Sequence, residues 1–371
     1  MDQQSASKNP GLSRVQRILA VSSCKGGVGK STTAVNLALA LRRYGLRVGL
    51  LDADVYGPSL PTLLRPQDTQ LFQREADGLI LPLEVLGLQV MSFGWIDPAQ
   101  QRGAAILRGP MVSQVVGQLA GRVAWEELDY LVIDFPPGTG DIQLTLTQQI
   151  PITAALIVTT PQQLSFVDVV KGIQMFDTVK VPTVGVLQNM SYYECCGEKH
   201  YIFGEGAREK LVKQFGFRHT FEIPIDPRLS SDGDAGTPMV ASRPDDPISN
   251  IYYEIAEAVH GEINTLIQTG GTPVLTYNVG QNCELTFPDG RILEIPPVEL
   301  RFACRCALCV SETTGERLIT REQIDPDIYP GQIKPVGNYA AAVEWSDGHT
   351  SSIYPFDYLI ERFDAQSEAT P

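Results

Sequence analysis

A glycine-rich loop near the N-terminus holds the residues best suited to chemistry. Residues 22–33 combine closely spaced glycines with Lys30 and Ser31, directly before a helical pattern. Glycine lets the backbone wrap a phosphate with its N–H groups facing the negative charge. The lysine adds a positive charge on the β/γ-phosphates, and the serine hydroxyl is placed to hold Mg²⁺. The loop is therefore predicted to bind a nucleotide through Gly26, Gly27, Val28, Gly29, Lys30, Ser31 and Thr32.

Carboxylates follow two apolar runs further along the chain. Residues 46–51 lead into Asp52 and Asp54, and residues 130–133 lead into Asp134. Because the carboxyl ends of parallel strands meet at one edge of a sheet, we expect these side chains beside the glycine-rich loop. A carboxylate in that place binds Mg²⁺ directly or through water. Asp134 is therefore predicted to be a Mg²⁺ ligand.

Most of the seven cysteines fall into two groups that suit metal or redox chemistry. Cys195 and Cys196 are adjacent, and they are predicted either to bind an iron–sulfur cluster or to be inert thiols. The second group has the spacing Cys-x-Cys-x-x-Cys and is followed by a histidine. Three thiolates and one imidazole are a common set for structural zinc, although thiolates also suit iron–sulfur clusters. Zinc, a cluster and unliganded thiols therefore stay open at Cys304, Cys306, Cys309 and His349.

Short apolar strands alternate with helices in the part of the chain that must position these residues. Strand patterns occur at residues 18–21, 46–51, 88–93, 130–133, 154–160 and 184–189, and helical patterns at 34–43, 111–119, 167–179 and 248–268. A short hairpin is predicted around residues 77–78, and residues 55–61 are predicted to be a loop because of their Gly and Pro. The alternation predicts an α/β fold with a doubly wound, mostly parallel sheet covered by helices on both faces.

The character of the sequence changes after a Gly-Gly-Thr-Pro linker. We predict a flexible tail at 1–16, a P-loop ATPase domain at 17–269, a linker at 270–274 and a smaller β-rich, metal-binding domain at 275–366. Within the second domain, Asp-Gly turns occur at 289–290 and 347–348, and each is followed by a mixed apolar, proline and acidic patch. Two related hairpin units are therefore predicted, with chance similarity as the alternative.

The charge and the hydropathy pattern limit the partners and the location. The formal net charge is −14, from 29 basic and 43 acidic residues. This charge argues against nucleic acid and against an anionic membrane surface as partners. Residues 1–17 have no apolar core of a secretory signal, and no run approaches the roughly 18 apolar residues of a membrane span. We therefore expect a cytoplasmic protein.

Lys25 makes the glycine-rich loop more specific. The pattern Lys-Gly-Gly-x-Gly-Lys-Ser that begins there resembles the deviant Walker A loop of the MinD/Mrp/NifH class of ATPases. The runs that begin at Asp52 and Asp134 are similar to switch I and switch II of the Mrp/ApbC family within that class. The resemblance implies that Lys25 reaches the nucleotide of a partner subunit in a homodimer. It also implies that Asp54 positions or activates the attacking water, that Asp52 supports the metal shell, and that Lys25, Lys30 and Asp54 are the catalytic residues.

Two further segments fit the Mrp/ApbC family. The family's adenine-binding asparagine corresponds to Asn189, which without the resemblance would be assigned to capping a turn. Pro224 and Asp226 lie in a stretch that is similar to the loop completing the base pocket. The family also has a Cys-x-x-Cys shortly after the asparagine, through which two subunits bridge one [4Fe–4S] cluster. This chain departs from that pattern, because Cys196 keeps the second position while Tyr193 occupies the first.

The second domain resembles the zinc-binding N-terminal domain of γ-butyrobetaine hydroxylase. The matching residues are Leu300-Arg301, the Cys-x-Cys-x-x-Cys run and the stretch from Trp345 to His349. In that domain such a set of three cysteines and one histidine binds zinc. The resemblance therefore implies zinc here, with an iron–sulfur cluster as the rival.

The resemblances together imply an ATP-dependent carrier or assembly factor for iron–sulfur clusters. It would bind and hydrolyse ATP with Mg²⁺ at a homodimer interface and pass a [4Fe–4S] cluster from scaffolds to apo iron–sulfur proteins. The alternative is a MinD/ParA-type ATPase switch for positioning or partition. Such switches usually carry a terminal amphipathic membrane helix or a basic DNA-binding face, and this sequence shows neither. A third hypothesis makes the second domain an interaction module that the ATPase regulates.

Overall fold

The chain folds into two compact units, each described here by itself. The structure is a computed structural model, and it describes residues 9–96, 109–204, 219–311 and 314–364. The first unit includes residues 1–206 and 221–260, and the second includes residues 261–371. The change from one unit to the other falls within a long helix, α11 (Pro247–Thr269).

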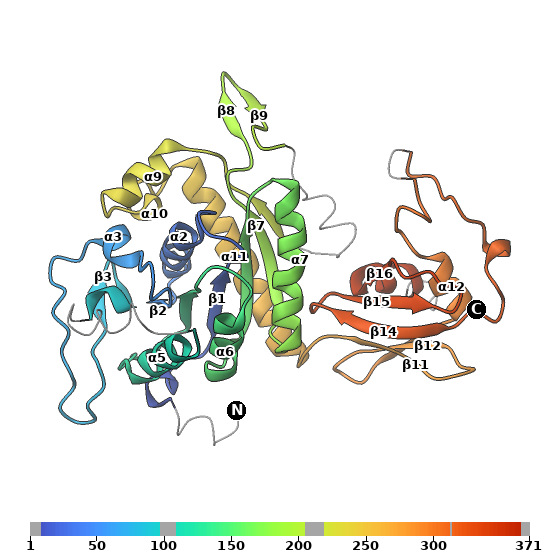
Figure 1. Cartoon of the computed structure of the whole chain (residues 1–371), viewed down its shortest axis with the longest axis horizontal. Coiled ribbons are helices and arrows are strands. Elements are labelled where there is room, and N and C mark those ends of the chain that lie inside the picture. Colours follow the sequence, from blue (N-terminus) through green and yellow to red (C-terminus); the bar gives the residue numbers. More distant parts are fainter. Residues whose placement is uncertain (1–8, 97–108, 205–218, 312–313, 365–371) are drawn as a thin grey trace. The chain divides into compact units, whose positions relative to one another are not determined.

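An eight-stranded sheet forms the centre of the first unit (Figure 1). Its order is β10-β7-β6-β1-β5-β2-β4-β3. The pairings from β7 across to β4 are parallel, and β3 is antiparallel to β4. The strands are β1 (Ile18–Ser22), β2 (Val48–Asp52), β3 (Leu83–Val85), β4 (Leu88–Ser92), β5 (Tyr130–Asp134), β6 (Ala154–Thr159), β7 (Thr183–Gln188) and β10 (Thr220–Glu222). The prediction of a mostly parallel sheet is confirmed.

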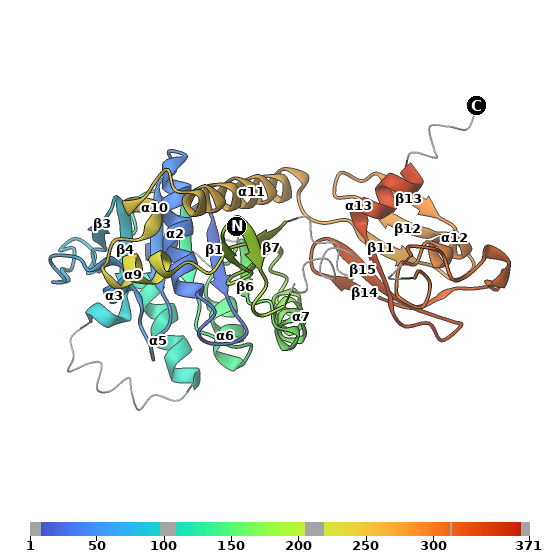
Figure 2. The same ribbon diagram turned by 90° about the horizontal axis from the view of Figure 1, so that it is seen from above.

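Helices cover both faces of this sheet (Figure 2). On one face lie α2 (Lys30–Arg43) and α11, which contact each other where the Arg43 guanidinium stacks on the ring of Tyr253. The other face carries α5 (Gly109–Arg122), α6 (Asp141–Gln149) and α7 (Gln163–Thr178). Strands β1, β2, β5, β6 and β7 are buried along their whole length. That burial explains their continuous apolar sequences.

Short elements complete the first unit. They are α3 (Leu60–Leu64), α9 (Pro227–Asp234), α10 (Met239–Ser242), two 3₁₀ turns (Pro10–Leu12 and Phe93–Trp95) and a hairpin, β8 (Tyr193–Cys195) and β9 (Glu198–His200). Helix α3 corrects the prediction that residues 55–61 are all loop, because the helix begins at Leu60. The turn predicted at residues 77–78 is present, but its flanks pair only through one bridge, between Gln73 and Ile80. Among the described residues, none of the helices has both the length and the hydropathy needed to cross a bilayer.

Two similar three-stranded antiparallel sheets build the second unit. The first contains β11 (Val274–Tyr277), β12 (Cys283–Thr286) and β13 (Ile292–Ile295), followed by α12 (Pro297–Phe302). The second contains β14 (Pro330–Val336), β15 (Ala340–Trp345) and β16 (Ser352–Pro355), followed by α13 (Phe356–Leu359) and a π-helical turn (Ile360–Asp364). Each predicted Asp-Gly turn joins the second and third strands of its sheet. One hydrophobic core is shared by both sheets, so the two predicted hairpin units form one domain.

Candidate functional site: a P-loop cavity and two groups of thiols

The predicted P-loop lies between the end of β1 and the start of α2. Gly27 and Gly29 have φ angles of 75° and 85°, in the left-handed region that favours glycine. A Cβ on Gly29 would lie 2.2 Å from the side-chain nitrogen of Asn189, so glycine is required for space as well as for conformation. The amide of Thr33 donates to the carbonyl of Gly29 at 2.9 Å. The helix therefore begins directly at the loop.

A cavity of about 430 Å³ opens at this loop. Its lining includes Lys25, Asp54 and every loop residue from Gly26 to Thr32 except Val28, which is buried. Thr62 and Leu63 of α3 also line the cavity. The sequence did not single out these two residues, because the loop predicted from Gly and Pro ended at residue 61 and no element was predicted directly after it. The volume and the convergent N–H groups at the start of α2 suit a phosphate-bearing ligand.

A buried ion pair joins the P-loop to the end of β5. The ammonium of Lys30 contacts one carboxylate oxygen of Asp134, and the two side chains are 7% and 0% exposed. The second oxygen of Asp134, Oδ2, is buried and has no hydrogen-bond partner within the part of the chain that the structure describes. Burial raises the pKa of Asp134, while the charge of Lys30 opposes the rise. An unpaired buried carboxylate oxygen beside a P-loop fits a Mg²⁺ ligand.

Asp52 and Asp54 have different surroundings although they are neighbours. The parallel register of β2 and β5 places Asp52 beside Asp134. Oδ2 of Asp52 accepts hydrogen bonds from the amides of Ser59 and Leu60 at 2.9 and 3.1 Å and from the Ser92 hydroxyl at 3.0 Å. Burial and the charge of Asp134 raise the pKa of Asp52 to about 7. Asp52 therefore fixes the loop after β2, whereas Asp54 lines the cavity itself.

Two predicted site residues, Lys25 and Asn189, connect the P-loop to the ends of neighbouring strands. The ammonium of Lys25 donates to Oε1 of Gln162, in the turn after β6, at 3.2 Å. The side-chain amide of Asn189 donates to the carbonyl of Val28 at 2.8 Å. Asn189 directly follows β7, so the sheet carries it onto the loop. Asn189 does not line the cavity, and its contact is with the loop backbone.

The other two predicted base-pocket residues, Pro224 and Asp226, lie in the segment before α9 and outside the cavity lining. Pro224 is partly buried. Asp226 caps α9 by accepting from the amide of Arg228 at 2.8 Å and forms an ion pair with the Arg228 guanidinium. Hydrogen bonds from Arg228 lower the pKa of Asp226. Asp226 therefore acts as a helix cap.

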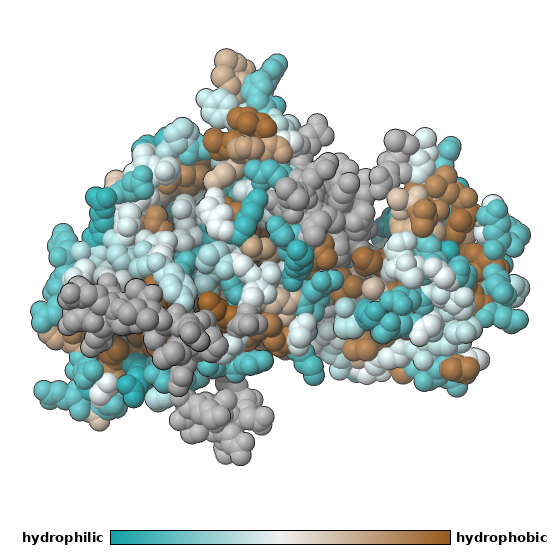
Figure 3. Space-filling model, in the orientation of Figure 1, coloured by the Kyte–Doolittle hydropathy of each residue, from teal (hydrophilic) through white to brown (hydrophobic). Residues whose placement is uncertain are grey.

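Cys195 and Cys196 occupy the end of the hairpin formed by β8 and β9, which projects from the first unit (Figure 1). Their sulfurs are 3.4 Å apart and both residues are exposed. Cys196 and Gly197 have φ angles of 57° and 80°, as a tight two-residue hairpin turn requires. Exposed apolar surface lies at the base of the hairpin, where Ile202 and Phe203 are 60% and 42% exposed (Figure 3).

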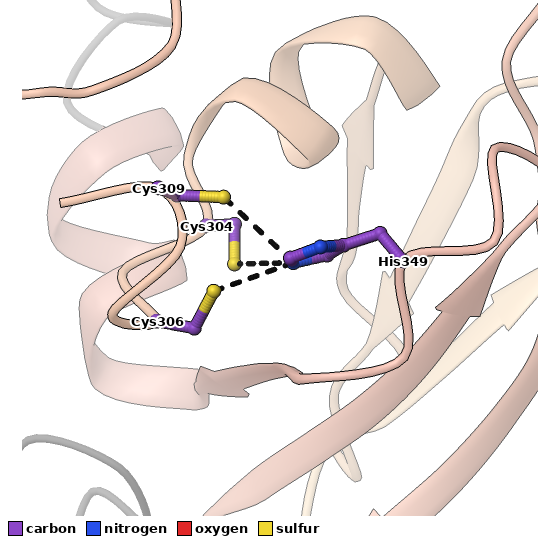
Figure 4. A group of neighbouring side chains, drawn as sticks. All are labelled: Cys304, Cys306, Cys309 and His349. Carbon is purple, nitrogen blue, oxygen red and sulfur yellow. Dashed lines mark hydrogen bonds between the residues drawn. The ribbon is translucent and has the colours of Figure 1, made fainter.

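The second group of thiols converges on one imidazole (Figure 4). Nε2 of His349 lies 3.4, 3.4 and 3.7 Å from the sulfurs of Cys304, Cys306 and Cys309. All four ligand atoms lie within 4.8 Å of one another. Zinc–sulfur bonds of about 2.3 Å in a tetrahedron place the sulfurs about 3.8 Å apart, so the spacing fits a single ion. The ligands of a four-iron cluster each bind a different iron and must stand further apart.

The surroundings of this group restrain its sulfurs. Burial raises the pKa of Cys304 to about 12 and also raises the pKa of Cys309. Burial disfavours the Cys306 thiolate too, but hydrogen bonds, including one from Ser351, lower its pKa overall. Buried thiols with raised pKa values need a nearby positive charge to become thiolates. Cys283, by contrast, lies in the core without being part of the group.

Comparison with protein families accounts for most of the chain. Residues 14–260 match the family model of the NUBPL iron-transfer P-loop NTPases, and residues 277–360 match the model of the γ-butyrobetaine hydroxylase-like N-terminal domain. A chloroplastic Fe–S cluster assembly factor from Arabidopsis thaliana is 47% identical over 95% of this chain. The match spans 65% of the length of that relative. An iron–sulfur cluster carrier protein of Escherichia coli is 46% identical over 68% of this chain and 69% of its own length.

Solved structures agree with these matches. A nucleotide-binding protein from Archaeoglobus fulgidus, in complex with ADP, is 36% identical, with a TM-score of 0.57 over 66% of this chain and 95% of its own. The cell division ATPase MinD of Pyrococcus furiosus, 21% identical with a TM-score of 0.50 over 66% of this chain and 98% of its own, shows the same fold. Both resemblances predicted from the sequence are thus confirmed. The chain belongs to the family of NUBPL iron-transfer P-loop NTPases.

Proposed function

We propose that this protein is an ATP-dependent carrier or assembly factor for iron–sulfur clusters. One observation most directly supports a coupling between ATP binding and cluster binding: a single segment links the P-loop to the pair of cysteines. Asn189 contacts the P-loop backbone, and the same segment continues into the hairpin that presents Cys195 and Cys196. A change at the loop on nucleotide binding can therefore act on the thiols through a few residues. Relatives that are 46–47% identical carry the names of cluster carriers and assembly factors.

The P-loop cavity has the residues for ATP binding and hydrolysis. Lys30 exchanges Asp134 for the β/γ-phosphates, which frees Asp134 to join the Ser31 hydroxyl in holding Mg²⁺. Asp54 is placed in the cavity to orient the attacking water, and Asp52 keeps its loop in position. Lys25 leaves Gln162 and reaches the nucleotide of a second subunit, so the active form is a homodimer. Mg²⁺ supplies charge stabilisation of the phosphates in this scheme.

The cluster is the cargo, and the hairpin is its binding place. Both thiols are exposed, so a second copy of the chain can reach them. Two hairpins supply up to four thiolates, the number that a [4Fe–4S] cluster takes. Because Cys195 and Cys196 are adjacent in the chain, binding through both of them is strained. The alternative is that each subunit binds the cluster through one cysteine. Scaffolds would load the cluster, and apo iron–sulfur proteins would receive it.

The group of Cys304, Cys306, Cys309 and His349 holds a structural zinc ion in this proposal. The atom spacing suits one tetrahedral ion rather than a cluster. Cys304 and Cys309 are buried, whereas a transferable cargo needs access. This site stabilises the second unit, and the hairpin carries the cluster.

Anaerobic reconstitution with iron and sulfide tests the proposal. The full-length protein should gain the brown visible absorbance of an iron–sulfur cluster while zinc stays bound at one ion per chain. A Cys195→Ser/Cys196→Ser variant should stay colourless and keep its zinc. Cys24→Ser is the matched control, because Cys24 is a thiol of the same unit whose sulfur is engaged with the carbonyl of Asp168 at 2.8 Å. A wild-type protein that stays colourless would contradict the carrier function.

A further inference from the structure

Arg301 is the buried charge closest to the Cys/His group of the second unit. It lies on α12, one turn before Cys304, and is only 7% exposed. Burying a guanidinium costs free energy unless its charge and N–H groups find partners. The partners of Arg301 therefore indicate what it does.

One edge of the guanidinium reaches the ligand sulfurs. Nη1 of Arg301 donates to Sγ of Cys309 at 3.3 Å. The other two sulfurs accept from hydroxyls, Cys306 from Ser351 at 3.5 Å and Cys304 from Ser352 at 3.3 Å. Of these three donors, Arg301 is the charged one. Three thiolates and a neutral imidazole around a divalent ion leave one negative charge in excess. Arg301 can balance that charge, because water screens charges only weakly at a buried site.

The other edge of the guanidinium fixes the turn that presents the histidine. Nε of Arg301 donates to Oδ2 of Asp347 at 2.9 Å. Oδ1 of Asp347 accepts from the amide of His349 at 3.0 Å. The carbonyl of His349 in turn accepts from the amide of Trp345 at 2.9 Å. The backbone of His349 is therefore hydrogen-bonded through both its amide and its carbonyl. Arg301 stabilises this turn through its contact with Asp347.

We propose that Arg301 is a positioning residue of the metal site. It orients the sulfur of Cys309 toward the ion and, through Asp347, fixes the turn that carries His349. Within the second unit, the three cysteines follow the first sheet and its helix α12, whereas His349 lies between the last two strands of the second sheet. The Arg301 side chain contacts both parts of the site. The inference rests on the proposal that the group binds zinc.

Zinc affinity of the full-length protein is the first test, measured by competition with a chromophoric zinc chelator. Loss of a residue that orients metal ligands typically weakens metal binding ten- to a hundredfold, and Arg301→Gln should weaken zinc binding by about that factor. Arg301→Lys should restore only part of the affinity, because lysine keeps the charge but lacks the fork that reaches both Cys309 and Asp347. Arg321→Gln is the matched control: it removes the same charge from an exposed ion pair with Glu299. Its affinity should stay within about twofold of the wild type.

Cobalt(II) substitution gives a second readout that a purely structural role would not change. Its visible spectrum reports the thiolate ligands and their geometry. The sulfur-to-cobalt bands should shift or weaken in Arg301→Gln and remain as in the wild type in Arg321→Gln.

The outcomes separate this inference from the zinc proposal. A wild-type protein that takes up no zinc would overturn the zinc proposal itself. A wild type that binds zinc, together with an Arg301→Gln variant of equal affinity and unchanged cobalt spectrum, would overturn the role of Arg301. If Arg301→Gln lacks the wild-type circular dichroism, Asp347→Asn decides the question. This variant keeps an acceptor for the His349 amide and loses the charge that holds Arg301, so it should bind zinc severalfold more weakly. Unchanged affinity there would overturn the proposal.

Discussion

At the scale of single residues, the P-loop cavity is organised around charges that compensate one another. Lys30 and Asp134 are both buried and form an ion pair with each other. Removing one partner of such a pair leaves an uncompensated buried charge. The same two side chains are the ones assigned to phosphate and Mg²⁺. We therefore expect nucleotide binding to exchange one set of compensating charges for another.

Lysine substitutions should separate binding from catalysis. Lys30→Ala should abolish detectable ATP binding and lower hydrolysis by at least about a hundredfold, because it removes a charge that stabilises the transition state. Lys25→Ala should still bind ATP but should lose both hydrolysis and nucleotide-dependent self-association. A fluorescent ATP analogue, phosphate release and light scattering measure the three properties. Lys171→Ala, at an exposed position on α7, is the control and should behave as the wild type. Equal hydrolysis by Lys25→Ala and the wild type would contradict its assignment.

The carboxyl of Asp52 predicts a pH dependence of stability. Its pKa is raised from 3.8 to about 7, mainly by burial. Between these values the folded protein keeps a proton that the unfolded chain has released, so this group lowers stability as the pH rises from about 4 to 7. The upper bound of the effect is about 4 kcal/mol. Thermal unfolding at pH 5 and pH 7.5 should show a larger loss of midpoint in the wild type than in Asp52→Asn. Parallel losses in the two proteins would show that Asp52 does not titrate in this range.

At the scale of elements, the sequence predicts what is periodic and misses what depends on tertiary contacts. The buried strands β1, β2, β5, β6 and β7 are mostly apolar runs. Two of them, β2 and β5, end in the carboxylates Asp52 and Asp134, which parallel pairing must place side by side. Helix α3 was missed, because Pro61 indicates a loop although proline is tolerated in a first helical turn. The edge strands β3 and β10 have three residues each, too few to show a period.

The candidate sites follow the same division. Glycine spacing and cysteine spacing are local, so the P-loop and the Cys-x-Cys-x-x-Cys group could be predicted. The contacts of Arg301 with Cys309 and Asp347 could not, because they join α12 to a distant turn. The same holds for Asn189, whose contact with the Val28 carbonyl depends on the neighbouring positions of β1 and β7 around β6.

Metal removal should destabilise the second unit. Its core contains Cys304 and Cys309, and folding energy is linked to metal binding at such sites. Treatment with a strong chelator should lower the unfolding midpoint of the second unit and leave that of the first unit unchanged, as calorimetry would show. Cys304→Ser should reproduce the shift and lose the zinc. Cys283→Ala, which removes a buried thiol outside the group, should lower stability but keep one zinc per chain. A chelator-resistant midpoint in a zinc-loaded protein would contradict a structural role.

At the scale of the whole molecule, the residues assigned to ATP and to the cluster all lie in the first unit, and the Cys/His group lies in the second. The predicted boundaries at 269 and 275, the homodimer, the cytoplasmic location and the absence of nucleic-acid and membrane partners stay predictions. The relative from Arabidopsis thaliana is chloroplastic, whereas the carrier protein of similar identity is bacterial. The division of residues between units makes the role of the second unit testable.

Deleting residues 272–371 should leave ATP hydrolysis and cluster binding intact, because the P-loop cavity and the hairpin belong to the first unit. Zinc should be lost with the deleted residues. Circular dichroism checks the fold, and phosphate release and visible absorbance check the two activities. If transfer of the cluster to an acceptor also survives unchanged, the second unit is not the interaction module that delivers the function. Loss of hydrolysis in a folded truncated chain would contradict the assignment of the ATP site.

Cluster transfer to an acceptor tests the central claim most directly. The reconstituted full-length protein is mixed anaerobically with an apo-dehydratase whose activity requires a [4Fe–4S] cluster, with and without ATP and Mg²⁺, and dehydratase activity is followed over time. The account predicts that activity appears with the wild type at a rate that ATP changes. It also predicts that Lys30→Ala transfers at a rate that ATP does not change, and that Cys195→Ser/Cys196→Ser transfers nothing. A transfer rate that is independent of ATP in the wild type, or unaffected by loss of both hairpin cysteines, would contradict the account.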